Sequence, residues 1–150
     1  MTSVIGWDLG GANLKLARLE GGRITLVAQI PCPVTPDRSK FDRALGEALK
    51  LCPSGETPRH AVPLTGELSD VFATREEGVA YLVGMLRDAA GAERLSIYAG
   101  GAGFLTPDLA VMTPLDVASA NWHASAVLAA THCAYGLLVD VGTTTTDLVP

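Results

Sequence analysis

Polar and hydrophobic residues alternate over the first thirty positions of the chain, with the two-residue period of β-strands. This alternation predicts three strands, at residues 4–8, 13–19 and 23–30. Glu20-Gly21-Gly22 separates the second strand from the third and is typical of a hairpin turn. The segment therefore predicts an antiparallel three-stranded meander.

Three later stretches have the three- and four-residue spacing of amphipathic helices. We expect the first helix at residues 41–49, the second at residues 79–86 with an end near Gly91, and the third from Thr113-Pro114 to about residue 132. Capping boxes are expected at their N-termini, formed by Ser39 with Asp42, Thr74 with Glu77, and Thr113 with Asp116.

Short apolar strands are predicted at residues 60–64, 95–99 and 136–140, so strands alternate with helices after the meander. This order of elements predicts an α/β fold in which helices flank a mixed sheet.

Composition indicates one domain with its own core, mostly of Leu, Val and Ala, because 48% of the 150 residues are hydrophobic and only 5% are aromatic. The net charge of −5 at pH 7 argues against a nucleic-acid partner, since phosphate backbones are bound by clustered Lys and Arg. The three cysteines form no C-x-x-C pair, which favours structural thiols in a reducing compartment.

The 23 residues between Asp116 and Asp140 carry no formal charge, which is also a feature of membrane-spanning segments. Their Asn, His, Ser and Thr side chains would lack hydrogen-bond partners in a bilayer, so a buried helix followed by a strand is the better interpretation. The N-terminus shows no basic segment followed by an apolar one. We therefore expect a cytoplasmic protein without a membrane partner.

Two turns of similar composition follow the first and last predicted strands. The first turn reads Asp8-Leu9-Gly10-Gly11-Ala12-Asn13. A similar turn begins 132 positions later with Asp140-Val141-Gly142, continues with four threonines, and is followed by Asp147. Glycines let the backbone turn tightly and bring N–H groups close to phosphate oxygens, and Asn or Thr side chains add donors. A single Asp-x-Gly-Gly turn is only a hairpin signal, but the second copy favours a phosphate site between two facing loops.

The pattern assigns a role to each residue type in the two turns. An Asp at a strand end can hold hydrated Mg²⁺, which uses few carboxylates, and Lys15 can place a point charge on a phosphate oxygen. The expected phosphate-binding residues are Gly10, Gly11, Asn13, Gly142, Thr143, Thr144 and Thr145, and the expected magnesium ligands are Asp8, Asp140 and Asp147.

Further candidates lie outside the turns. Thr65, Glu67 and Asp70 follow the fourth predicted strand, where loops of α/β sheets bind ligands, and they either cap a helix in a solvated turn or approach the substrate. Asn121 is expected on the buried side of its helix, where its amide needs a partner in the ligand or the backbone. Trp122 is interpreted as a packing residue. The chain has no serine-hydrolase elbow and no P-loop.

The paired turns resemble the phosphate motifs of the acetate and sugar kinase/Hsp70/actin superfamily. Residues 63–72, 118–124 and 140–147 are similar to its hydantoinase/oxoprolinase-related branch, which is associated with tetrahydromethanopterin-linked one-carbon metabolism and includes the methanofuran-biosynthesis synthases. The resemblance spans nearly all of the chain. It implies a ribonuclease-H-like mixed sheet at residues 1–133 as the first lobe of an actin-like fold, and the start of a second lobe at residues 134–150, with the remainder of that lobe outside this chain.

The resemblance implies a transferase that condenses an aminomethylfuran diphosphate with a tyramine phenol and releases pyrophosphate. In that reaction Asp140 is expected to bind Mg²⁺, Lys15 to stabilise the leaving group and Glu67 to act as the base, whereas Thr65, Asp70 and Asn121 lie near the substrate. The alternatives are an ATP-dependent kinase or ATPase, and a nucleotide-binding regulator without catalysis. A small-molecule phosphate or diphosphate is the expected partner, and a homo-oligomer is left open.

Overall fold

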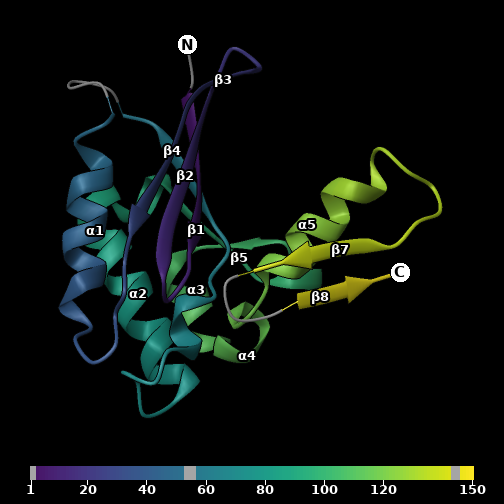
Figure 1. The fold of residues 1–150 in the computed structure, drawn as a ribbon. Coiled ribbons are helices and arrows are strands. Elements are labelled where there is room, and N and C mark those ends of the chain that lie inside the picture. The colour runs from purple at the N-terminus through teal and green to yellow at the C-terminus, as the bar shows by residue number, and fades with distance from the viewer. Residues whose placement is uncertain (1–2, 53–56, 143–145) are drawn as a thin grey trace.

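The computed structural model describes residues 3–52, 57–142 and 146–150. These residues form a six-stranded mixed sheet with helices packed against it, and a separate two-stranded sheet near the C-terminus (Figure 1). The predicted α/β architecture is confirmed. No helix within these ranges has the length and hydrophobicity needed to cross a bilayer.

The six-stranded sheet has the order β3-β2-β1-β4-β5-β6. Its first three strands pair antiparallel, as the alternating pattern predicts, whereas β1, β4 and β5 are parallel neighbours and β6 returns antiparallel to β5. The strands are β1 (Ser3–Leu9), β2 (Asn13–Glu20), β3 (Arg23–Pro31), β4 (Arg59–Val62), β5 (Leu95–Tyr98) and β6 (Phe104–Leu105).

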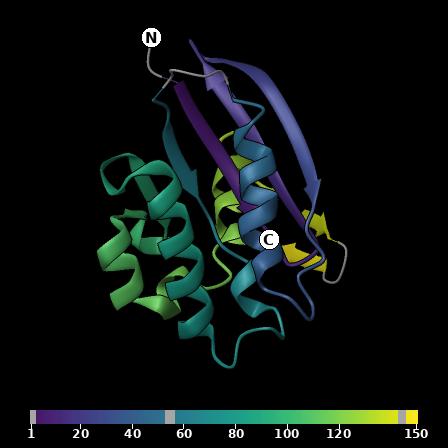
Figure 2. The same ribbon diagram turned by 90° about the vertical axis from the view of Figure 1, so that its left-hand side faces the viewer.

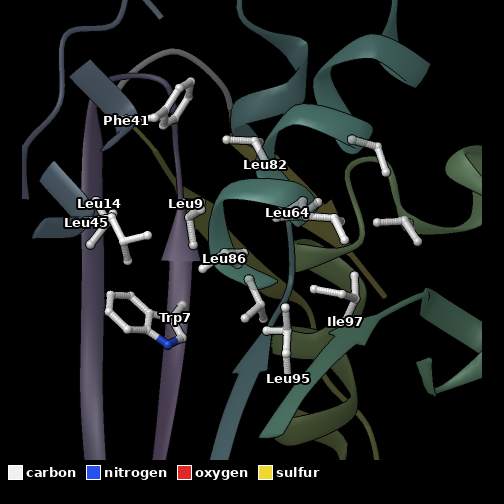
Figure 3. Packing of buried hydrophobic residues seen from close by; sticks show 14 of the residues in the cluster. Trp7, Leu9, Leu14, Phe41, Leu45, Leu64, Leu82, Leu86, Leu95 and Ile97 are labelled. Atoms are coloured by element: carbon white, nitrogen blue, oxygen red, sulfur yellow. The ribbon is translucent and has the colours of Figure 1, made fainter. Parts of the chain in front are cut away.

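Two long helices, α1 (Ser39–Leu49) and α2 (Arg75–Ala90), cover one face of this sheet. Figure 2 looks onto that face, with α1 in front of the strands. Alternate residues of β1, namely Ile5, Trp7 and Leu9, are buried beneath them. Figure 3 shows side chains of α1 and α2, among them Phe41 and Leu86, packing over the strands. Burial of each such large apolar side chain stabilises the fold by roughly 1.5–3 kcal/mol. The ends of β1 and β4 are therefore held in place by a well-packed core.

The cap of α2 is confirmed in its main feature. The Thr74 side chain accepts the N–H of Glu77, and the helix ends at Gly91, whose φ is +83°. The Ser39–Asp42 box is wrong, because Arg38 occupies the cap position and Asp37 accepts the Ser39 N–H. A side chain just before the helix therefore takes the place of the predicted pair.

The single helix expected from residue 113 to residue 132 is also wrong. The chain instead forms α4 (Pro114–Val117) and α5 (Asn121–Ala130), separated by Ser119 in the left-handed region with φ of +55°. The predicted Thr113–Asp116 box is not formed, since the Thr113 hydroxyl donates to the carbonyl of Leu109 instead. An additional helix, α3 (Pro107–Met112), precedes them, and three short 3-10 helices complete the fold: η1 (Gly66–Leu68), η2 (Ala92–Arg94) and η3 (Gly100–Ala102).

Within the described part of the chain, the last two strands, β7 (Leu138–Val141) and β8 (Thr146–Val149), pair only with each other (Figure 1). Their register places Asp140 opposite Asp147, so both aspartates lie on one face of the hairpin. This face is the one that carries Leu138 and Val149, which line a small apolar cavity of about 280 Å³ against α5.

Candidate functional site

A cavity of about 570 Å³ lies where β1 ends and the chain turns into β2. Four segments that are distant in sequence form most of its walls: the turn at residues 8–15, the stretch 65–70 after β4, the break before α5 at residues 119–122, and β8, with Thr35 as a further lining residue. The carboxyl end of a central strand is where open α/β sheets bind ligands. Nine of the candidate residues line this one cavity: Asp8, Gly10, Gly11, Asn13, Lys15, Thr65, Asp70, Asn121 and Asp147.

The glycine turn at the base of the cavity is held by its own backbone. The Gly10 N–H donates to the carbonyl of Asn13, and the carbonyls of Gly11 and Ala12 accept the N–H groups of Val34 and Cys32. A Cβ on Gly11 would lie 2.5 Å from Ser69 Oγ, so a side chain at this position would force either that hydroxyl or the turn to move. The turn therefore brings backbone, rather than side chain, to the cavity surface.

The stretch after β4 is fastened to the end of β1. Both the N–H and the hydroxyl of Thr65 donate to the carbonyl of Leu9, over 3.3 and 3.1 Å. A Cβ on Gly66 would lie 2.8 Å from the Phe41 ring and 2.9 Å from the same carbonyl. Thr65, Ser69 and Asp70 consequently lie at a fixed distance from the glycine turn.

The charges in the cavity are three carboxylates and one ammonium group, those of Asp8, Asp70, Asp147 and Lys15. Lys15 lies opposite Asp8 in the β1–β2 register, and its Nζ is 3.0 Å from Asp8 Oδ2. An ion pair this exposed contributes only about 0–1 kcal/mol. A ligand with its own charges can therefore exchange partners with it at little cost.

Glu67 lies beneath the cavity and not on its wall. Its side chain is 2% exposed, and its Oε1 accepts the Ser119 N–H over 2.8 Å, whereas Oε2 has no hydrogen-bond partner among the described residues. Burial raises the pKa of this carboxyl above its usual range, and the Ser119 N–H lowers it in part. The hydrogen bond of this carboxyl group is to the backbone at the break before α5. The base role expected from the sequence would require the carboxyl group to reach the substrate, and its burial does not allow this.

The break before α5 brings two residues to the cavity rim. Asn121 and Trp122 form the first turn of α5, and both line the cavity. Asn121 is half-buried, as expected in part, and its side chain makes no hydrogen bond to the described part of the chain. Trp122 is 38% exposed, so the interpretation as a packing residue misses its position on the cavity wall. Trp122 begins a new helix after the break at Ser119, and the helical spacing of the sequence did not predict this break.

The second turn contributes one described residue to the cavity. Asp147 lines it together with Asp8, whereas its register partner Asp140 and the exposed Gly142 do not. The expected residues Thr143, Thr144 and Thr145 lie outside the described residues. One aspartate from each turn thus lines the same cavity. In the first turn it is Asp8 at the end of the strand, whereas in the second turn it is Asp147 and not Asp140.

The metal set of Asp8, Asp140 and Asp147 is not gathered into one cluster. Among residues 3–52, 57–142 and 146–150, no group of three or more His, Cys, Asp or Glu side chains could hold a metal ion. Mg²⁺ nevertheless binds through one or two carboxylates together with waters and substrate phosphates. Asp8 and Asp147 offer such a donor set only when a phosphate ligand completes it.

The sequence pattern that defines the hydantoinase/oxoprolinase proteins matches residues 59–150. The chain belongs to this family. The resemblance seen in the motifs is therefore confirmed. The matched range includes Thr65, Ser119, Trp122 and Asp147 of this hydantoinase/oxoprolinase-family protein, whereas the glycine turn precedes it.

The chain is also similar to a protein of Methanocaldococcus jannaschii, the (4-{4-[2-(gamma-L-glutamylamino)ethyl]phenoxymethyl}furan-2-yl)methanamine synthase. The two are 29% identical over 148 residues, which is 98% of this chain and 43% of the relative. The chain thus spans less than half the length of this curated relative. Because the similarity covers the glycine turn, it extends to all four walls of the cavity in this hydantoinase/oxoprolinase-family protein.

Proposed function

We propose that the cavity binds the diphosphate of a small-molecule substrate, as part of a transferase that joins an aminomethylfuran to a tyramine phenol. The observation that carries the proposal is the shared cavity of Asp8, Lys15, the glycine turn and Asp147. The name of the archaeal relative supports the substrate class, because it describes a phenoxymethyl-furan product. The substrate assignment for this chain rests on that similarity.

In the proposed reaction the phenol oxygen forms a bond to the methylene carbon that joins the furan ring to the diphosphate, and the bond from that carbon to the diphosphate oxygen breaks. Pyrophosphate leaves with the electron pair, and the phenol proton passes to a base or to water. Negative charge grows on the leaving group, so groups that bind it more tightly at the transition state accelerate the step. Lys15, Gly11 and Ala12 all line the cavity, which supports that role for the Lys15 ammonium group and the backbone of the turn.

Magnesium is part of the proposal. Asp8 and Asp147 would hold it, with Asp140 opposite Asp147 on the hairpin, and the ion would neutralise charge on the diphosphate. Lys15, released from its ion pair with Asp8, would then be free to contact a phosphate oxygen.

We also propose the two-lobe arrangement that the resemblance implies. Residues 1–133 would form a ribonuclease-H-like lobe of an actin-like fold, and residues 134–150 would begin a second lobe. The strand order of the main sheet supports the first part. The separate β7–β8 sheet supports the second, as do its exposed apolar side chains Val139, Val141 and Leu148.

One experiment separates the candidate reactions. The protein is incubated with Mg²⁺ and a phenol acceptor such as γ-glutamyltyramine, together with either [5-(aminomethyl)furan-3-yl]methyl diphosphate or ATP. Release of pyrophosphate that requires the acceptor, with formation of the aryl ether, supports the transferase. Formation of ADP from ATP would assign a kinase or ATPase instead. Tight binding of ATP without turnover would assign the regulator.

A further inference from the structure

The two tryptophans of the chain occupy contrasting environments. Trp7 is 3% exposed in the core, and its Nε1 donates to Nδ1 of His60 over 2.9 Å. Trp122 is far more exposed and lines the same large cavity as the glycine turn. An indole that only filled the core would be as buried as Trp7. The position of Trp122 is that of a side chain with a surface left for a ligand.

The Trp122 ring contacts His123, which is itself part of a cluster of aromatic rings. His123 meets it edge to face, with 5.5 Å between the ring centroids. His123 Nδ1 is in turn hydrogen-bonded to the hydroxyl of Tyr98 over 2.8 Å, and Tyr98 packs edge-on against Phe104. These contacts tie the first turn of α5 to β5 and β6. A ring restrained in this way loses little freedom when a ligand stacks on it.

The cavity therefore combines two kinds of surface. The glycine turn and Lys15 suit a phosphate group, whereas Trp122 suits an apolar flat ring. A substrate that carries a charged diphosphate next to an aromatic ring would match these two surfaces.

We propose that Trp122 is the stacking contact for the aromatic ring of the substrate, held beside the diphosphate that the glycine turn binds. The inference rests on the proposed function, which supplies the substrate class. Two rings share this chemistry, the furan of the donor and the phenol of the acceptor. Trp122 would thereby select ring-bearing substrates over aliphatic ones, and would contribute little to binding of the diphosphate itself.

Binding by titration calorimetry tests this directly. The ligands are pyrophosphate, furfuryl diphosphate, butyl diphosphate and tyramine, each with Mg²⁺, against the unaltered protein, Trp122→Leu and Trp122→Phe. In Trp122→Leu we expect binding of furfuryl diphosphate or of tyramine to weaken about threefold to tenfold. Pyrophosphate and butyl diphosphate should change less than twofold, and Trp122→Phe should retain most of the affinity for the ring ligand.

The two arms distinguish the outcomes. A loss confined to furfuryl diphosphate assigns the donor ring to Trp122, and a loss confined to tyramine assigns the acceptor ring. Equal losses for all four ligands, or none for either ring ligand, overturn the inference, whereas the proposed function stands as long as the unaltered protein binds pyrophosphate. If the unaltered protein binds no diphosphate but Trp122→Leu still weakens tyramine, the proposed function fails and the ring contact stands. Absence of binding by every ligand overturns both. The emission of Trp7, which remains in both variants, reports whether they fold.

Discussion

Ser119 donates its backbone N–H to the buried carboxylate of Glu67, with 2.8 Å between the nitrogen and Oε1. The bond joins the stretch that carries Thr65 and Asp70 to the break that begins α5, although 52 positions separate the two residues. Both segments form walls of the cavity. This hydrogen bond therefore joins two of the cavity walls directly.

Replacing Glu67 tests how much this bond stabilises the fold. Glu67→Gln keeps an oxygen acceptor for the Ser119 N–H and removes a buried charge, so we expect the free energy of unfolding to change by less than about 1 kcal/mol. Glu67→Ala leaves that N–H unpaired and opens a void, and we expect a loss of about 2–4 kcal/mol. Urea unfolding at pH 7 measures both. Similar losses in the two variants would show that the acceptor oxygen is unimportant.

The buried Glu67 carboxyl also predicts a pH dependence. Burial raises its pKa in the folded protein, so between the unfolded and folded pKa values the folded chain binds more protons than the unfolded chain. The contribution of Glu67 to the free energy of unfolding therefore falls as the pH rises through this window. It is constant below the unfolded pKa and above the folded one.

Glu67→Gln cannot titrate and should not show this fall. The difference in unfolding free energy between Glu67→Gln and the unaltered protein should grow in favour of the variant from about pH 4 upward, and then level off. Urea unfolding at a series of pH values measures the difference, in which the effects of other carboxylates cancel. Parallel pH profiles for the two proteins would contradict the raised pKa.

Gly11→Ala tests the close approach of the glycine turn to Ser69. The new Cβ would lie 2.5 Å from Ser69 Oγ, so either the hydroxyl rotates or the turn shifts. We expect binding of pyrophosphate with Mg²⁺ to weaken about tenfold, because backbone donors would move away from the ligand. The paired change Gly11→Ala with Ser69→Gly should restore part of the affinity.

Gly46→Ala is the matched control for Gly11→Ala. Its Cβ would meet nothing within 4 Å in α1, away from the cavity. It should leave pyrophosphate binding unchanged and raise the free energy of unfolding by about 0.5–1 kcal/mol, as expected for Gly to Ala in a helix. Equal binding losses in both glycine variants would argue against a specific role for the turn.

Asp147 and Asp140 should differ in their effect on magnesium-dependent binding. Asp147 lines the cavity with Asp8, whereas Asp140 does not, although the two acids face each other across β7 and β8. We expect Asp147→Asn to weaken pyrophosphate binding tenfold or more in the presence of Mg²⁺, and Asp140→Asn to weaken it less. With EDTA in place of Mg²⁺ the difference should vanish. The opposite order of the two variants would return the metal role to Asp140.

The sequence predicts the main sheet well because its signals are local. Alternation in β1 and β2 is imposed by one buried face, and the Glu20-Gly21-Gly22 turn fixes their neighbour β3. The helical spacing of Phe41, Leu45 and Ala48 likewise follows from burial on one side of α1. Each of these patterns can be read from neighbours within a few positions.

The missed features depend on contacts between distant segments. The break at Ser119 is stabilised by Glu67, which no helical pattern around residue 119 could reveal. Trp122, which follows this break by three positions, is 38% exposed on the cavity wall. The choice of Asp147 over Asp140 depends on how the β7–β8 hairpin lies against the cavity, since a local pattern treats the two acids alike. Side-chain identity thus predicts candidates, and long-range packing decides which of them meet.

Gly78 is the last position that tests how the cavity wall is built. A Cβ on this residue of α2 would lie 2.7 Å from the Cα, Cβ and carbonyl oxygen of Glu67, which are backbone and near-backbone atoms that cannot rotate away. Gly78→Ala should therefore push η1 outward and lower the free energy of unfolding by about 1–3 kcal/mol. Gly84→Ala, on the same helix with nothing within 4 Å of its Cβ, should instead raise it by about 0.5–1 kcal/mol.

Because η1 carries Glu67, the Gly78→Ala shift should also reach Ser119 and Trp122. Trp122 is the more exposed tryptophan, so acrylamide quenching of fluorescence should change in Gly78→Ala and stay unchanged in Gly84→Ala. A destabilised Gly78→Ala variant with unaltered quenching would mean that the two walls are not coupled through Glu67. If Gly78→Ala were stabilised like Gly84→Ala, the space between α2 and η1 would be larger than the 2.7 Å contacts at Gly78 indicate.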